Sequence, residues 1–181
     1  MFHEEILEEL KITLLGIKKE EISVLEEELQ KAERIFCDGL GRSGLSCRSF
    51  AMRLMHLGMN CFYVGDTMTP AVGPGDLLLV CSGSGESEAL ISHAEKAKKN
   101  GAKIALVTGN SASRLREVAD IQILIQAPQK DEAKGEKESV LPMGSLFEDA
   151  SALLFESLVL DLMEQRHETG QSMFQRHANL E

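Results

Sequence analysis

Three serines and two glycines occupy residues 82–87, a segment that reads Ser-Gly-Ser-Gly-Glu-Ser between an apolar run and a helix-like stretch. The first N–H groups of a helix lack intrahelical partners and carry partial positive charge. Glycine lets the backbone approach a ligand closely, and serine adds a hydroxyl. Because a helix cap uses only one serine, simple capping by Ser84 or Ser87 is the weaker alternative. The segment predicts a phosphate site whose expected contacts are Ser82, Gly83, Ser84 and Ser87.

A second loop, residues 39–44, reads Gly-Leu-Gly-Arg-Ser-Gly and follows the apolar run 35–38. It matches the G-x-G-x-x-G pattern of dinucleotide-binding proteins, and Asp66 lies 22 positions beyond its last glycine. Three features argue against a dinucleotide: the chain has no room for a substrate domain, the turn is unusually polar, and the serine loop would have no role. A small phosphorylated ligand accounts for both loops, and the residues of this loop expected to contact it are Gly41, Arg42 and Ser43.

Arg42 is the charged member of this loop. In the ligand-binding interpretation its guanidinium pairs with phosphate or sugar oxygens. The alternative is an ordinary exposed arginine on the protein surface.

The elements that must position these loops are strands buried on both faces. Continuous apolar runs, rather than alternating ones, are typical of a parallel sheet covered by helices. They occupy residues 35–38, 61–64, 77–81, 104–108 and 121–125. The pattern predicts an α/β fold, a three-layer αβα sandwich with a five-stranded, parallel, doubly wound sheet of flavodoxin type. In such a sheet both loops lie at carboxyl ends of strands, near the point where the strand order reverses.

The chain of 181 residues has the size of one domain, 1–181. Helical spacing with a break at Gly16 predicts two N-terminal helices within 1–33. We expect the sheet core in 34–126, a C-terminal interface helix in 140–168 and a tail in 169–181. The helices expected at 44–58 and 145–165 are apolar around most of their circumference, which predicts a homo-oligomer; a broad core-facing stripe is the alternative.

The formal charge of −10 argues against nucleic acid and anionic membranes as partners. The N-terminus lacks the features of a signal peptide, and no apolar run approaches membrane-spanning length, so a cytoplasmic location is expected. The four cysteines form no C-x-x-C pair and fall mostly in apolar runs. We therefore expect reduced, structural thiols and no metal site.

Together, the two loops and the spacing of the five strands resemble the sugar isomerase (SIS) domain family. Within it, residues 50–58, 143–148 and 173–181 are similar to the 6-phospho-3-hexuloisomerases. This resemblance implies an isomerase that interconverts D-arabino-hex-3-ulose 6-phosphate and fructose 6-phosphate in the ribulose monophosphate route of formaldehyde fixation. It also implies a homotetramer that needs no cofactor and works with a hexulose-phosphate synthase. Ser87 stands where the family usually has threonine, and the hydroxyl is retained.

This reaction needs a base that removes the proton on C2, forms a 2,3-enediol and returns a proton to C3. Glu148 lies in the segment that resembles the family's active-site region, and it is the candidate base. From the residues alone, Ser145 and Glu148 also fit a capping box. His56 and His177 are the candidates for proton transfer to substrate oxygens, although each could be structural.

The polar stretch 164–172 predicts a tail that is not held on its own subunit and that brings His177 to a neighbouring site. SIS domains also serve as ligand-binding modules in regulators, so a non-catalytic sugar-phosphate sensor, or an isomerase of another phosphosugar, is the competing function.

Overall fold

The computed structural model describes residues 1–127 and 139–180. Two helices come first, α1 (His3–Leu15) and α2 (Lys19–Lys31). The central part consists of β1 (Ile35–Gly39), α3 (Gly41–His56), β2 (Cys61–Tyr63), β3 (Leu77–Ser82), α4 (Glu88–Lys99), β4 (Lys103–Thr108), α5 (Arg114–Val118) and β5 (Ile121–Leu124). The last elements are the long helix α6 (Ser145–Gln165) and the short helix α7 (Gly170–Phe174).

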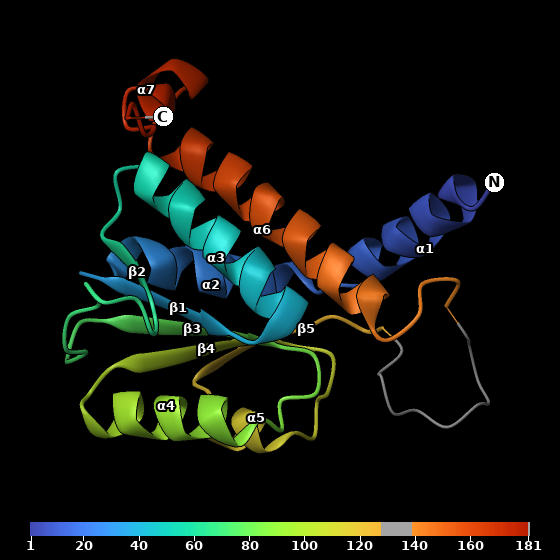
Figure 1. Cartoon of the computed structure of the whole chain (residues 1–181), viewed down its shortest axis with the longest axis horizontal. Coiled ribbons are helices and arrows are strands. Elements are labelled where there is room, and N and C mark those ends of the chain that lie inside the picture. The colour runs from blue at the N-terminus through green and yellow to red at the C-terminus, as the bar shows by residue number, and fades with distance from the viewer. Residues whose placement is uncertain (128–138, 181) are drawn as a thin grey trace.

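All five strands are parallel, and their order in the sheet is β2-β1-β3-β4-β5. Helices α3 and α6 cross one face of this sheet, while α4 and α5 cover the other (Figure 1). The predicted three-layer sandwich is therefore confirmed. The strand order reverses between β1 and β3, so the carboxyl ends of these two strands border the usual ligand position of a doubly wound sheet.

The alternation of side chains along each strand divides the core in two. On β1, Ile35 and Cys37 pack with α2, α3 and α6, whereas Phe36 packs with α4. Strands β1 and β3 are buried along their whole length, which explains why their sequences are continuously apolar.

The four cysteines are free, and three of them are completely buried. Burial raises the pKa of the Cys81 thiol well above its ordinary value, which keeps it protonated and unreactive. The burial of Cys37, Cys47 and Cys81 agrees with the predicted structural role of these thiols, and their reduced state stays a prediction.

Two boundaries differ from the sequence prediction. Helix α3 begins at Gly41, inside the glycine loop, because Gly41 adopts a positive φ of 58° and turns the chain directly into the helix. The tail contains a helix of its own, α7.

Candidate functional site

The glycine loop brings the start of α3 into direct contact with the end of β1. A Cβ on Gly44 would lie 2.4 Å from the Gly39 carbonyl oxygen, and one on Gly39 would lie 2.9 Å from the Gly44 Cα. Only hydrogen atoms fit at these two positions. The Tyr63 hydroxyl donates to the same Gly39 carbonyl oxygen at 2.7 Å. These contacts fix the first turn of α3, which carries Arg42 and Ser43, at the carboxyl edge of β1.

Arg42 joins the first turn of α3 to the first turn of α6. Its Nη1 donates to the Ser145 Oγ at 2.6 Å and lies 3.0 Å from the Glu148 Oε2. Its Nη2 donates to the Asp149 Oδ1 at 2.8 Å. The Arg42 side chain is 53% exposed, whereas Glu148 is 5% exposed. The structure thus places a buried carboxylate beside a cation that remains accessible to a ligand.

The start of α6 differs from the capping box that its sequence allows. Gly144, with a φ of 78°, occupies the N-cap position, so Ser145 is the first residue of the helix rather than its cap. The Ser145 hydroxyl instead accepts the hydrogen bond from Arg42. Sequence reasoning also missed Asp149. Its position directly after Glu148, which makes two consecutive acidic residues, was the only signal for it in the sequence.

The serine loop joins β3 to α4. The Ser82 Oγ accepts from the Gly85 N–H at 3.1 Å, and the Ser84 Oγ accepts from the Glu86 N–H at 3.4 Å. Ser87 occupies the N-cap position of α4, yet its side chain makes no capping hydrogen bond. The capping alternative therefore does not account for Ser87. The hydroxyl oxygens of Ser82 and Ser84 accept hydrogen bonds within the loop, and each hydroxyl can still donate its proton to a ligand.

The two loops emerge from neighbouring strands. Gly39, which ends β1, pairs in register with Cys81 of β3, and Ser82 follows Cys81. The serine loop therefore lies at the same edge of the sheet as Arg42 and the first turn of α6. The structure places the predicted phosphate-binding residues and Glu148 at this shared edge.

A histidine and a carboxylate that sequence reasoning missed meet on the α4 side of this edge. Asp38, near the end of β1, is 3% exposed. Its Oδ1 accepts from the Gly39 N–H at 2.8 Å, and its Oδ2 lies 2.8 Å from the His93 Nδ1. Only a polar residue within the buried run of β1 could have drawn attention to this pair.

His56 and His177 lie at the other end of α3. His56 is the last residue of this helix and Arg42 lies in its first turn, so 14 residues, or about 21 Å of helix, separate them. Figure 1 shows α7 beyond the C-terminal end of α6, opposite to the end where α3 and α6 begin. Within one chain the structure brings the two histidines together, with ring centroids 5.2 Å apart, but does not bring them to Glu148.

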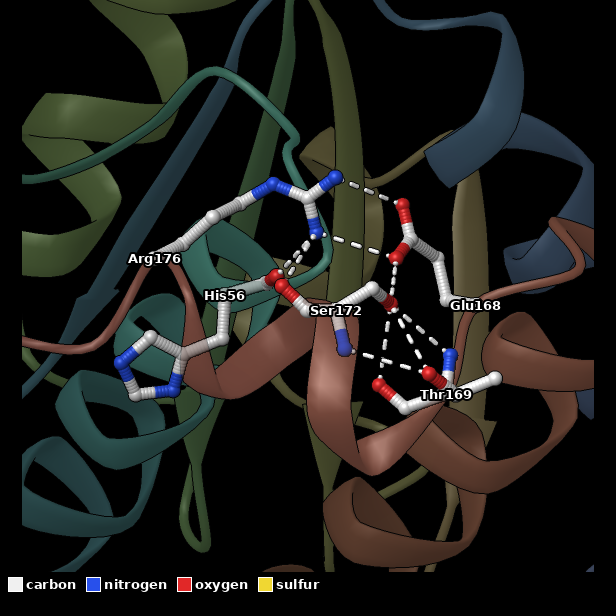
Figure 2. A network of polar contacts seen from close by, with 5 residues as sticks. All are labelled: His56, Glu168, Thr169, Ser172 and Arg176. Carbon is white, nitrogen blue, oxygen red and sulfur yellow. Dashed lines mark hydrogen bonds and ion pairs between the residues drawn. The ribbon is translucent and has the colours of Figure 1, made fainter.

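The tail is docked on its own chain, so the prediction that the polar stretch 164–172 would not hold it there is wrong. Met173 is 4% exposed and belongs to the core. Arg176 binds both Glu168 and the His56 carbonyl oxygen (Figure 2). Phe174 and Leu180, two apolar side chains of the tail, remain 75% and 99% exposed.

In residues 1–127 and 139–180, no three His, Cys, Asp or Glu side chains gather in a way that could hold a metal ion. Across the same part of the chain, none of the helices has the length and apolarity needed to cross a bilayer.

Comparison with known proteins gives one family and several near full-length relatives. The SIS domain model matches residues 28–148. A 3-hexulose-6-phosphate isomerase of Bacillus subtilis is 42% identical over 98% of this chain and 96% of its own length. A 3-hexulose-6-phosphate isomerase of Mycobacterium gastri is 40% identical over 97% of this chain and 88% of its own length.

Solved structures agree with this relationship. A Methanococcus jannaschii protein, whose crystal structure infers a molecular function of 3-hexulose-6-phosphate isomerase, matches with a TM-score of 0.87 and 30% identity over 98% of each chain. The Vibrio vulnificus NanR protein complexed with ManNAc-6P matches with a TM-score of 0.75. At 24% identity, and with 64% of that longer chain covered, NanR shows a shared fold alone.

Proposed function

The chain belongs to the SIS domain family, and from this premise we propose that it interconverts D-arabino-hex-3-ulose 6-phosphate and fructose 6-phosphate. The observation that carries this proposal is the match, at 42% identity over 98% of the chain, to a 3-hexulose-6-phosphate isomerase. The arrangement of Arg42, Glu148 and the serine loop at one edge of the sheet supports it.

In the proposed mechanism the serine loop and the start of α4 bind the phosphate, and Ser82, Gly83, Ser84 and Ser87 supply the contacts. Gly41, Arg42 and Ser43 face the sugar from the start of α3. Glu148 removes the proton from C2, the C2–H electrons form the C2=C3 bond, and the C3 carbonyl oxygen takes up a proton to complete the 2,3-enediol. When O2 loses its proton, the electrons return through the double bond, and C3 accepts the proton that Glu148 carries.

Arg42 serves two roles in this proposal. Without a ligand it stabilises the buried Glu148 carboxylate at 3.0 Å. Because the guanidinium is half-exposed, it can also pair with the oxygen on which negative charge develops during enediol formation. A lysine would not reproduce its three contacts, since they depend on the flat, forked shape of the guanidinium.

We further propose that His177, together with His56, exchanges protons with O2 and O3 of a substrate bound to a neighbouring subunit. The distance along α3 separates both histidines from Glu148 of the same chain. An apolar surface on α3 and α6 offers the contact between subunits. It consists of Leu45, Met52, Met55, Leu153 and Leu160, which are 39–68% exposed.

A homotetramer formed over this surface completes each site with residues of two chains. We propose a cytoplasmic location, because free thiols suit a reducing compartment. We also propose that a hexulose-phosphate synthase supplies the substrate.

The deciding experiment is incubation of the purified protein with fructose 6-phosphate in deuterated water. An isomerase exchanges the carbon-bound protons next to the carbonyl for deuterium, whereas a sugar-phosphate sensor binds the compound and leaves its protons in place. Coupling to hexulose-phosphate synthase, ribulose 5-phosphate and formaldehyde then identifies the 3-hexulose substrate. Exchange without turnover in the coupled assay would assign the protein to a different phosphosugar.

A further inference from the structure

Arg176 and Glu168 close the tail with a two-pronged ion pair (Figure 2). The Arg176 Nη2 donates to the Glu168 Oε1 at 2.9 Å, and the Nη1 donates to the Oε2 at 3.0 Å. This pairing of a flat guanidinium with both oxygens of one carboxylate fixes direction as well as distance. We call the Glu168–Arg176 pair the tail clasp.

The clasp is attached to the C-terminal end of α3. The Arg176 Nη1 donates to the His56 carbonyl oxygen at 2.9 Å. His56 is the last residue of α3, where carbonyl oxygens lack intrahelical partners and a cation is favourable. Gly58 makes room for the contact, because a Cβ there would lie 3.2 Å from the Arg176 Nε.

The turn between the two clasp residues is held by reciprocal capping. The Thr169 Oγ1 accepts from the Ser172 N–H at 3.1 Å, and the Thr169 N–H donates to the Ser172 Oγ at 2.9 Å. The Ser172 hydroxyl also donates to the Glu168 carboxylate. Helix α7 is thus fixed at its start by the cap and after its end by Arg176.

This arrangement holds three rings against one another. His177, the residue after Arg176, stacks on His56 at 5.2 Å between ring centroids and on Phe174 at 5.9 Å. The His177 Nδ1 lies 2.9 Å from the Ala178 carbonyl oxygen, which can only accept. In the neutral ring Nδ1 therefore carries the proton, and Nε2 is the basic nitrogen.

We propose that Glu168 and Arg176 are positioning residues whose ion pair fixes the place and the stacking of His177. The contribution of the clasp to turnover rests on the role proposed above for His177. The positioning itself does not depend on that role.

The titration of His56 reports on the docked tail. Burial, followed by the nearby His177 and Arg53, lowers the pKa of His56 below its ordinary value of 6.5. The charged groups around it are Arg53 on its own helix and Arg176 with Glu168 from the tail. A lowered pKa means that His56 binds a proton more readily when the tail is undocked than when it is docked. Neutral His56 therefore favours docking fully above pH 6.5, and this contribution is lost as the pH falls toward the lowered pKa of the docked state.

The test compares Glu168→Gln, Glu168→Asp and Arg176→Lys with the matched control Glu164→Gln, which removes an exposed carboxylate near the end of α6. Two quantities are measured in the assembled protein: the histidine titrations, by NMR of ¹³C-labelled histidine, and the steady-state kinetics. In Glu168→Gln we expect the pKa of His56 to rise toward 6.5, faster amide exchange in residues 173–177, and a kcat lowered about tenfold with little change in KM. Glu168→Asp should show smaller changes than Glu168→Gln in the His56 pKa, in amide exchange and in kcat. The control Glu164→Gln should match the wild type in all three.

An unchanged His56 titration and unchanged amide exchange in both Glu168→Gln and Arg176→Lys would overturn the clasp. A released tail with full turnover, in a protein that His177→Ala inactivates, would overturn its positioning role in catalysis. If His177→Ala itself is fully active, the proposed proton transfer by His177 fails, and the NMR readout still decides whether the clasp holds the ring.

Discussion

Arg42 shows how one side chain defines the chemistry of the site. Its guanidinium contacts three side chains near the start of α6, those of Ser145, Glu148 and Asp149. Of the two carboxylates, only that of Glu148 is buried. Asp149 is 37% exposed at its side chain and serves as an anchor for the arginine. Replacing the two carboxylates separately therefore distinguishes proton transfer from anchoring.

Glu148→Gln should lower kcat by about 10²–10⁴-fold, because the amide keeps the size of the side chain but cannot accept a proton. We expect a small change in Tm, since Arg42 keeps its contacts with Ser145 and Asp149. Asp149→Asn is the matched control and should retain most of the turnover. A stable Glu148→Gln enzyme with wild-type kcat would show that another residue is the base.

The serine loop is tested by the double substitution of Ser82 and Ser84 with alanine. Each charge-assisted hydrogen bond to the phosphate that is lost should weaken binding by about 1.5–3 kcal/mol. The KM for fructose 6-phosphate should therefore rise while thermal unfolding stays close to that of the wild type. Ser92→Ala, on the body of α4, is the control. An unchanged KM in the double variant would remove phosphate binding from these two hydroxyls.

At the scale of elements, the contact of α3 with β1 holds the site in place. Gly44→Ala introduces a Cβ only 2.4 Å from the Gly39 carbonyl oxygen, and both atoms belong to rigid elements. The helix must shift, so we expect a loss of about 1–3 kcal/mol in the free energy of unfolding together with a lower kcat. Gly73→Ala is the control, because no atom lies within 4 Å of its added Cβ. Equal Tm values for the two variants would contradict this packing argument.

At the scale of the whole molecule, the apolar surface of α3 and α6 is expected to be covered by other copies of the chain. Leu160 is 61% exposed in the isolated chain, so Leu160→Glu should convert the proposed tetramer to smaller species and reduce turnover. Mass measured by light scattering checks this expectation. Val24→Glu, a similarly exposed position on α2, should leave the mass unchanged. A wild-type protein that is monomeric would contradict the proposed assembly.

Sharing of sites between chains is tested by mixing Glu148→Gln subunits with His177→Ala subunits. If each site takes its glutamate from one chain and its histidine from another, the mixed oligomers should regain part of the wild-type activity. Mass spectrometry of differently tagged chains verifies that mixing has occurred. Mixed oligomers without activity, when both parents are inactive, would place the two residues of a site on one chain.

The sequence alone was enough for the sheet and the two loops, because these depend on local properties of the chain. All five predicted strands exist. The three central strands, β1, β3 and β4, are buried along all or nearly all of their length, and a buried strand is continuously apolar wherever it lies. The glycine loop was recognisable because Gly39 and Gly44, which are in close contact in the structure, are also near each other in the sequence. The candidate site at the carboxyl edge followed from the parallel topology.

Only the tertiary structure decided which side chains meet. The hydrogen bond from Arg42 to Ser145 joins positions 103 apart, and the one from Arg176 to His56 joins positions 120 apart. Such contacts depend on how α6 packs across α3, and no local pattern records that angle or register. The tail prediction was wrong for this reason. A polar stretch predicts exposure to solvent, but Arg176, held by Glu168, donates to the His56 carbonyl oxygen, and Met173 enters the core; both contacts exist only after the chain has folded.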